Sequence, residues 1–173
     1  MKNLIVVLCL FFLSTISYSQ KIGVNTLLFD NGWSSFGYGG LVEYDFQLND
    51  NFDLTTQISV LYNTADTPIN DKKYFNIPIM IGVKYFVLQS SIKPFVSVEL
   101  VGSYFDHDYL TYDSHTGYNI LNESGMYFGG SGSVGTYIKL SELIDLNVNV
   151  RLGIISERYA DYFSYNLGLM YSL

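Results

Sequence analysis

The chain has 173 residues, of which 17% are aromatic and only 14% are charged, and its formal net charge is −7 at pH 7. Soluble globular domains average about 25% charged residues, so this composition does not suit a protein whose whole surface meets water. The negative charge argues against nucleic acid as a partner, because phosphate binding requires clustered Lys and Arg side chains.

Residues 1–19 have the features of a secretory signal peptide. Lys2 supplies the positive charge, residues 4–13 form a short apolar run, and residues 17–19 form a small-x-small cleavage site. The apolar run is shorter than the about 20 residues that a membrane-spanning helix needs, and it contains the lone cysteine. We therefore expect residues 1–19 to be removed on export. Residues 20–173 are expected to form one domain with no disulfide and no lipid anchor.

The chain after this signal alternates between two kinds of side chain. From Phe36 to Leu48 the even positions are mostly bulky and apolar, whereas the odd positions are mostly small, polar or charged. A period of two is the signature of a β-strand whose faces meet different environments. Similar segments recur, and we predict eight strands, at residues 21–29, 35–48, 52–62, 75–85, 93–105, 126–140, 145–156 and 163–173.

Short turns and longer polar segments separate these strands. Short turns are predicted at residues 49–51, 89–91 and 141–143, and the two longest connections, at residues 63–73 and 106–125, are predicted as loops. Pro78 falls inside the fourth predicted strand. Because proline cannot donate to a β-ladder, we expect a bulge there.

Eight strands joined in this way predict an all-β fold, an eight-stranded antiparallel up-and-down transmembrane β-barrel. Membrane barrels need an even number of tilted strands about 10 residues long, and closure removes the sheet edges that lipid cannot satisfy. We therefore predict a location in a bacterial outer membrane.

The alternative is a soluble lipocalin-like barrel with its bulky face inward. That arrangement would place Gly37, Gly82 and Gly153 on the water-facing surface, among other glycines of the same face. Small inward residues suit an eight-stranded lumen better, because it is just wide enough for side chains to fill. Aromatic residues toward both ends of the strands are also typical of membrane interfaces.

Several local features extend this reading to a family. They are the signal ending at Ser19-Gln20, the stretch Ile77-Pro78-Ile79, the segment Lys93-Pro94-Phe95-Val96 and an aromatic C-terminal strand. In these features the chain resembles the eight-stranded outer-membrane β-barrels, the group of OmpX and the OmpA transmembrane domain, and especially the short barrel proteins of Bacteroidetes. The resemblance implies architecture rather than activity. It also implies a monomer in contact with outer-membrane lipid, inserted by the barrel-assembly machinery.

Four charged residues fall on the face predicted to point inward: Glu43, Lys84, Glu99 and Arg151. Their positions relative to the predicted turns place them at comparable heights in a narrow lumen, where a charge must be paired or hydrated. We interpret them as a structural ion-pair cluster, and a proton or ion path is the alternative.

The segment at residues 106–125 contains several possible metal ligands and three tyrosines. Because the spacing of the ligands fits no recognised site, we expect no metal and no cofactor, and the tyrosines suit contact with a surface ligand. The ligands are Asp106, His107, Asp108, Asp113, His115 and Glu123, and the tyrosines are Tyr109, Tyr112 and Tyr118.

No enzyme activity is expected. A hydrolase needs a nucleophile, a base and an orienting group within reach, and the only two histidines, His107 and His115, lie in one predicted loop. The sequence favours a small outer-membrane barrel with a packed lumen and a structural or surface-interaction role, through external loops and an extracellular partner that the sequence does not identify. A small-solute conduit is the first alternative, and a lipid-modifying enzyme is the second.

Overall fold

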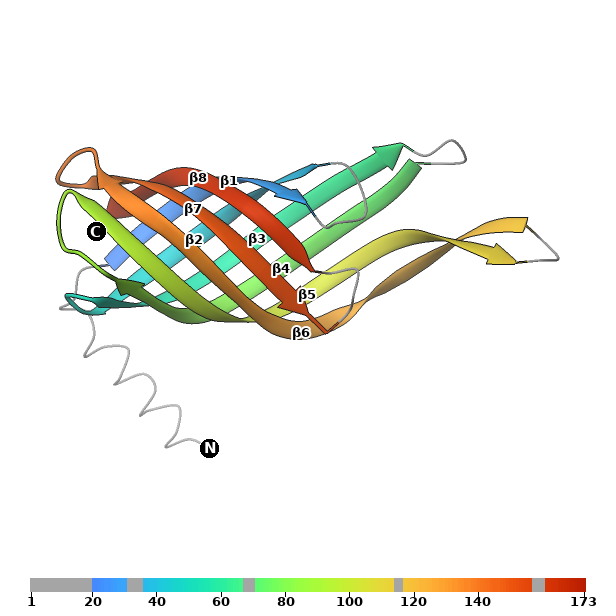
Figure 1. Cartoon of the computed structure of the whole chain (residues 1–173), viewed down its shortest axis with the longest axis horizontal. Coiled ribbons are helices and arrows are strands. Elements are labelled where there is room, and N and C mark those ends of the chain that lie inside the picture. The colour runs from blue at the N-terminus through green and yellow to red at the C-terminus, as the bar shows by residue number, and fades with distance from the viewer. Residues whose placement is uncertain (1–19, 31–35, 67–70, 114–116, 157–160) are drawn as a thin grey trace, which may run out of the picture.

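The protein forms one closed antiparallel β-barrel (Figure 1). The structure is a computed structural model that describes residues 20–30, 36–66, 71–113, 117–156 and 161–173, so the predicted signal at residues 1–19 lies outside the described residues. Each strand pairs with the next one, and β1 pairs with β8 to close the barrel. The strands are β1 (Gln20–Asp30), β2 (Gly37–Asn49), β3 (Phe52–Asp66), β4 (Asp71–Phe86), β5 (Ile92–Asp113), β6 (Gly117–Lys139), β7 (Ile144–Ile155) and β8 (Tyr162–Ser172).

The predicted number, order and direction of the strands are confirmed. Within the described ranges, no helix is long and apolar enough to cross a membrane. We call the end that carries the turns β2–β3, β4–β5 and β6–β7 the short-turn end, and both β1 and β8 have their chain-terminal ends there (Figure 1). The opposite end is called the long-loop end.

The predicted loop at residues 106–125 is wrong for most of its length. Strands β5 and β6 continue as one ladder until Asp113 pairs with Gly117, and their hairpin projects beyond the barrel at the long-loop end (Figure 1). This segment contains β-forming residues that pair with each other along the ladder, such as Tyr112 with Tyr118. Its many polar residues therefore indicate a hairpin surrounded by water rather than an irregular loop.

The predicted loop between β3 and β4 is also shorter than expected. These strands stay paired until Asp66 meets Asp71, whereas the sequence suggested a loop over residues 63–73. The other strand ends differ from the predicted ones by no more than two residues.

The bulge predicted at Pro78 is wrong. The β3–β4 ladder is interrupted there, but Ile58 pairs with Ile79 and Leu61 with Asn76, so the register is the same on both sides of the interruption. On the other side of β4 the ladder runs through Pro78, which pairs with Ser103. The proline therefore removes a local hydrogen bond, as expected from its missing N–H, without adding a residue to the strand.

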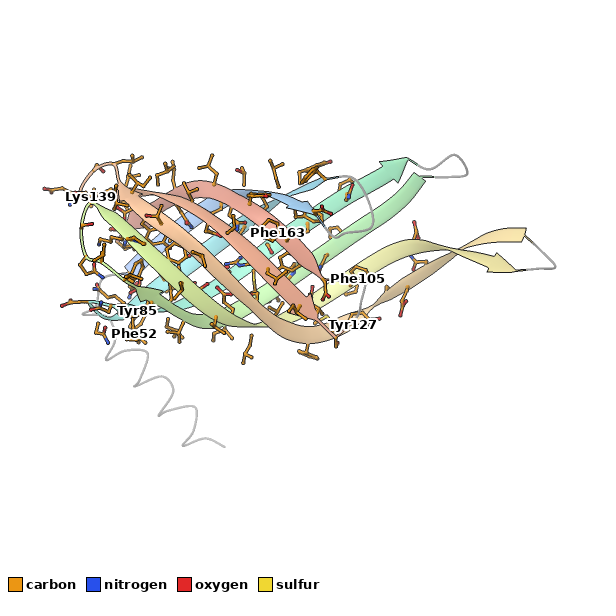
Figure 2. All side chains as sticks on the ribbon, in the orientation of Figure 1. Phe52, Tyr85, Phe105, Tyr127, Lys139 and Phe163 are labelled. Carbon is orange, nitrogen blue, oxygen red and sulfur yellow. The ribbon has the colours of Figure 1, made fainter. Side chains whose placement is uncertain are left out.

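The outer face of the barrel is apolar, as predicted (Figure 2). Val98 and Leu100 on β5 are 73% and 72% exposed, and all eight strands contribute exposed apolar side chains. Aromatic pairs lie toward both ends, with Phe52 and Tyr85 (ring centroids 5.0 Å apart) at the short-turn end and Tyr38 and Tyr62 (5.8 Å) at the long-loop end. An apolar belt between aromatic girdles is the surface of a barrel that sits in lipid.

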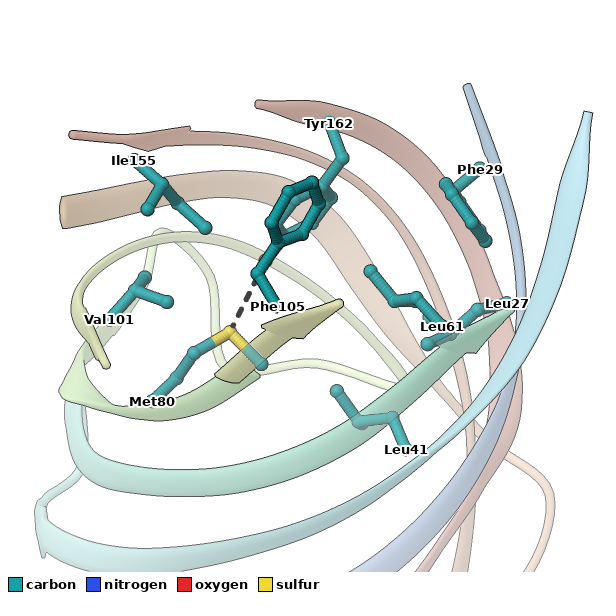
Figure 3. Packing of buried hydrophobic residues seen from close by; sticks show 9 residues of the cluster. All are labelled: Leu27, Phe29, Leu41, Leu61, Met80, Val101, Phe105, Ile155 and Tyr162. Atoms are coloured by element: carbon teal, nitrogen blue, oxygen red, sulfur yellow. Dashed lines mark hydrogen bonds between the residues drawn. The ribbon is translucent and has the colours of Figure 1, made fainter. Parts of the chain in front are cut away.

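The lumen contains one cluster of buried apolar side chains toward each end. The larger cluster is at the long-loop end (Figure 3) and consists of Leu27, Phe29, Leu41, Leu61, Met80, Val101, Phe105, Ile155 and Tyr162. The smaller one, at the short-turn end, consists of Phe86, Phe95, Tyr137 and Met170. Polar and charged side chains occupy the lumen between the two clusters.

Glycine lets neighbouring strands crowd into this narrow interior. A Cβ on Gly82 would lie 2.6 Å from the Cα of Glu99 and 2.8 Å from its Cγ, which is closer than Cβ contacts in proteins allow. The absence of a side chain at Gly82 therefore leaves the space that the Glu99 side chain uses in the lumen.

A charge placed on the outer belt tests the orientation of the two faces. We expect Leu100→Arg to lower the free energy of unfolding in lipid vesicles by about 2–4 kcal/mol, because the guanidinium would lie near the middle of the apolar belt. The measurement is reversible urea unfolding followed by tryptophan fluorescence or gel mobility.

The matched control is Leu88→Arg, because Leu88 is 58% exposed but lies in the short β4–β5 turn. We expect little change there. Equal losses at both positions would contradict the assignment of the belt.

Candidate functional site

Lys84 on β4 lies between two carboxylates in the lumen. Its Nζ donates to Glu43 Oε1 and to Asp45 Oδ2, the latter at 2.7 Å. Glu43 and Asp45 are two residues apart on β2, so both point inward. Lys84 also contacts the hydroxyl of Tyr137 from β6, which is 2.9 Å from Glu43 Oε1 and 2.7 Å from Asp45 Oδ2. We call these four residues the Lys84 cluster.

The Lys84 cluster is buried against the aromatic side chains of the short-turn end. The Lys84 ammonium is 4.8 Å from the ring centroid of Phe95 and 4.7 Å from that of Tyr137, within the range of a cation–π interaction. Lys84, Glu43 and Asp45 are each 1% exposed. Charges this far from water are stable only when they are paired and hydrogen-bonded.

Glu99 on β5 is the centre of a second polar group. Arg151 Nη2 lies 3.5 Å from Glu99 Oε1, and the hydroxyl of Ser131 donates to Glu99 Oε2 at 2.7 Å. Ser97 also donates to Glu99 Oε1, and its hydroxyl is 2.5 Å from that of Ser133. The carboxylate is therefore held by one cation and two hydroxyl groups.

A chain of asparagine amides runs from the Lys84 cluster toward β7 and β8. Asn25 and Asn147 donate to Glu43 Oε2 at 3.4 Å and 3.3 Å. Asn149 donates to Asn147 Oδ1 at 3.1 Å, and Asn166 donates to Asn149 Oδ1 at 2.5 Å. The Lys84 cluster is thus the start of a continuous chain of hydrogen bonds that reaches β8.

The four charged residues predicted to form one cluster all point into the lumen, in two separate groups. Glu43 contacts Lys84, and Glu99 contacts Arg151. Sequence reasoning missed Asp45 as a member, although it has the same parity on its strand as Glu43. Whether these pairs stabilise the barrel stays a prediction, tested below.

The carboxylates of the polar layer outnumber its cations. Three buried carboxylates, from Glu43, Asp45 and Glu99, face two buried cations, from Lys84 and Arg151. Arg151 Nε and Asp45 Oδ1 also have no hydrogen-bond partner among the described atoms. Removal of either cation would leave a buried carboxylate without its counter-ion.

The possible metal ligands of the sequence do not gather into a site among the described residues, where no three His, Cys, Asp or Glu side chains are placed to hold an ion. Asp106 and Asp108 share the amide of Asn122, which lies 2.8 Å and 3.0 Å from them. Glu123 accepts from the Tyr127 hydroxyl at 3.2 Å. The side chains of His107, Asp113 and His115 lie outside the described residues.

Residues 5–171 match a family described as a protein of unknown function, DUF3575. The chain belongs to this family. No curated protein matches its sequence.

Several solved structures share the fold. Neisserial surface protein A has a TM-score of 0.64 at 15% identity, covering 90% of this chain and 97% of that one. The outer membrane protein OprG from Pseudomonas aeruginosa has a TM-score of 0.65 at 12% identity, covering 90% and 96%. The attachment invasion locus protein Ail of Yersinia pestis has a TM-score of 0.58 at 9% identity, covering 90% and 97%. Together with the apolar outer face, the shared fold makes this DUF3575 chain an eight-stranded outer-membrane β-barrel.

Removal of the Arg151 charge tests the second polar group. We expect Arg151→Met to lower the free energy of unfolding by about 3–5 kcal/mol, because it leaves Glu99 buried without its counter-ion. Adding Glu99→Gln to this variant should recover much of the loss. The measurement is urea unfolding in lipid vesicles.

The control is Lys139→Met, since Lys139 is exposed at the short-turn end (Figure 2) and has no side-chain ion pair with a described residue. We expect it to resemble the wild type. An Arg151→Met variant as stable as the wild type would show that the pair contributes nothing.

Proposed function

We propose that this protein works at the cell surface through the β5–β6 hairpin and does not conduct solutes. The observation that carries the proposal is the length of that hairpin. Pairing of β6 with β7 begins only at Gly129, whereas β6 itself begins at Gly117. In outer-membrane barrels the short turns face the periplasm and the longer connections face outward, so the hairpin is expected to project outside the cell.

The composition of the hairpin defines the partner that suits it. Residues 106–125 contain four acidic residues and three tyrosines but no Lys or Arg. Tyrosine supplies large contact area at low entropic cost, and the acidic groups favour encounter with a basic surface. We therefore infer a partner with an exposed basic patch.

A hairpin-shortened variant tests this role. Residues 108–122 are replaced by Asn-Gly, which joins the paired residues His107 and Glu123 through a two-residue turn. Barrels in nanodiscs are passed over immobilised polylysine and, for comparison, immobilised heparin. We expect the wild type to bind polylysine in a salt-dependent manner, and the shortened variant to bind at least about tenfold more weakly.

The control shortens the β3–β4 hairpin instead, with Asn-Gly in place of residues 65–72 to join the paired residues Thr64 and Lys73. It should bind as the wild type does. Equal binding by the wild type and the β5–β6 variant, or preference for heparin, would refute the proposed role of the hairpin.

The packing of the lumen supports the proposal that the barrel does not conduct solutes. An eight-stranded barrel is just wide enough for side chains to fill, and here an apolar cluster lies toward each end of the polar layer. An ion that crossed the barrel would have to leave water and pass both apolar clusters, which include Phe86 and Phe95 at the short-turn end. Between the clusters it would meet buried side chains of both charges. We propose no catalytic role.

Planar-bilayer recording tests the conduit alternative. We expect no stable single-channel steps from purified protein, because conduction would require displacement of the buried aromatic side chains. A variant with Phe86→Ala and Phe95→Ala, which opens only the short-turn cluster, should remain closed by the cluster at the other end. Reproducible steps from the wild type that change size in Arg151→Met or Glu99→Gln would establish conduction instead.

A further inference from the structure

The lumen is open to water at the short-turn end, where it forms a polar cavity of about 150 Å³. Phe86 forms an apolar part of the cavity wall. The rest of the lining includes charged residues of both signs, among them Lys21, Asp53, Lys93 and Asp145. This volume is enough for several water molecules. It therefore suits a small solute rather than a macromolecule.

One ion pair in the cavity is already complete. Lys21 Nζ lies 2.8 Å from Asp145 Oδ2, and the same ammonium is 5.0 Å from the ring centroid of Tyr137. Because Lys21 and Asp145 neutralise each other, neither requires a counter-ion from a ligand. They form the fixed part of the cavity.

Asp53 is different: it pairs with Lys84 along the β3–β4 ladder, but its carboxylate forms no ion pair with the side chain of a described residue. The residue is only 5% exposed, it lines the cavity, and it makes no hydrogen bond or ion pair with a described residue. A buried carboxylate is normally paired. An unpaired one that opens into a cavity is suited to receive a donor from a ligand.

Lys93 supplies the complementary charge. It is half-buried on β5, lines the same cavity, and likewise has no ion pair or hydrogen bond from its side chain to a described residue. Asp53 and Lys93 form no ion pair with each other, and they are less exposed than Asp50, Lys139 and Glu142, the other charged residues that line the cavity outside the Lys21–Asp145 pair. A molecule that carries both charges would satisfy both groups.

We propose that this cavity binds a small zwitterion, an amino acid or the free end of a short peptide, from the periplasmic side. The ligand ammonium would contact Asp53, and the ligand carboxylate would contact Lys93. The proposal concerns the end of the barrel opposite the external hairpin, so it does not depend on the surface function proposed above.

The test is a titration of the folded full barrel in non-ionic detergent, followed by amide chemical shifts in NMR spectra. The probes are glycine, β-alanine and γ-aminobutyrate, which separate the two charges by increasing lengths, together with methylamine and acetate, which carry one charge each. We expect at least one zwitterion to bind about tenfold more tightly than either single-charge probe. Shifts should be confined to residues around the cavity.

Two variants assign the two contacts. Asp53→Asn should weaken binding of the zwitterions and of methylamine, whereas Lys93→Gln should weaken binding of the zwitterions and leave methylamine unchanged. Glu142→Gln is the control, since Glu142 lines the same cavity at its exposed rim, and it should bind as the wild type does. Only samples whose gel migration differs with and without boiling, as expected for folded barrels, are compared.

The outcomes that overturn the proposal are distinct. If the zwitterions bind no more tightly than methylamine, Lys93 takes no part in binding. If binding is unchanged in Asp53→Asn, the Asp53 carboxylate takes no part. If Asp53→Asn does not fold, the Lys93→Gln comparison decides alone, because it separates the zwitterions from methylamine.

Discussion

Lipid cannot form hydrogen bonds, and the architecture of this protein follows from that constraint. Every backbone N–H and C=O in the membrane must find a partner within the protein, so the sheet has to close on itself. Closure is completed by the pairing of β1 with β8. Only where the chain has left the lipid can a strand edge stay unpaired, as β6 does before Gly129. The projecting hairpin therefore also indicates where the membrane ends.

Closure at eight strands leaves an interior so narrow that almost every inward residue matters. A glycine such as Gly82 lets the neighbouring strand approach closely, because it has no side chain in the lumen. A long side chain of that strand, here Glu99, occupies the free space. Charged groups can occupy such an interior only with counter-ions at close range, which Lys84 and Arg151 supply. The polar cavity at the short-turn end adjoins this charged layer, since Asp53 pairs with Lys84 across the β3–β4 ladder.

Alternation in the sequence was enough to predict which face of each strand points inward, because parity is a local property of the chain. The grouping of Glu43 with Lys84 and of Glu99 with Arg151 was not predictable. The position of a residue along the barrel axis depends on the stagger between distant strands. This stagger cannot be calculated from the number of residues between the residue and a turn. The β5–β6 hairpin was missed for another reason, since polar composition indicates contact with water but does not distinguish a loop from a ladder in water. The place of Tyr137 beside Lys84 was not predictable either, because it depends on β6 lying across the barrel from β2.

The origin of the Lys84 cluster has a consequence for how the barrel assembles. Its members come from β2, β4 and β6, so no hairpin contains a complete set of partners. A partly formed sheet would hold Glu43 and Asp45 near an apolar environment before Tyr137 arrives from the other side. Such an intermediate is disfavoured, because Glu43 gains its contacts with Tyr137 and Asn147 only after β6 and β7 have joined the sheet. Folding of this barrel is therefore expected to be cooperative, with few stable states between the unfolded chain and the closed cylinder.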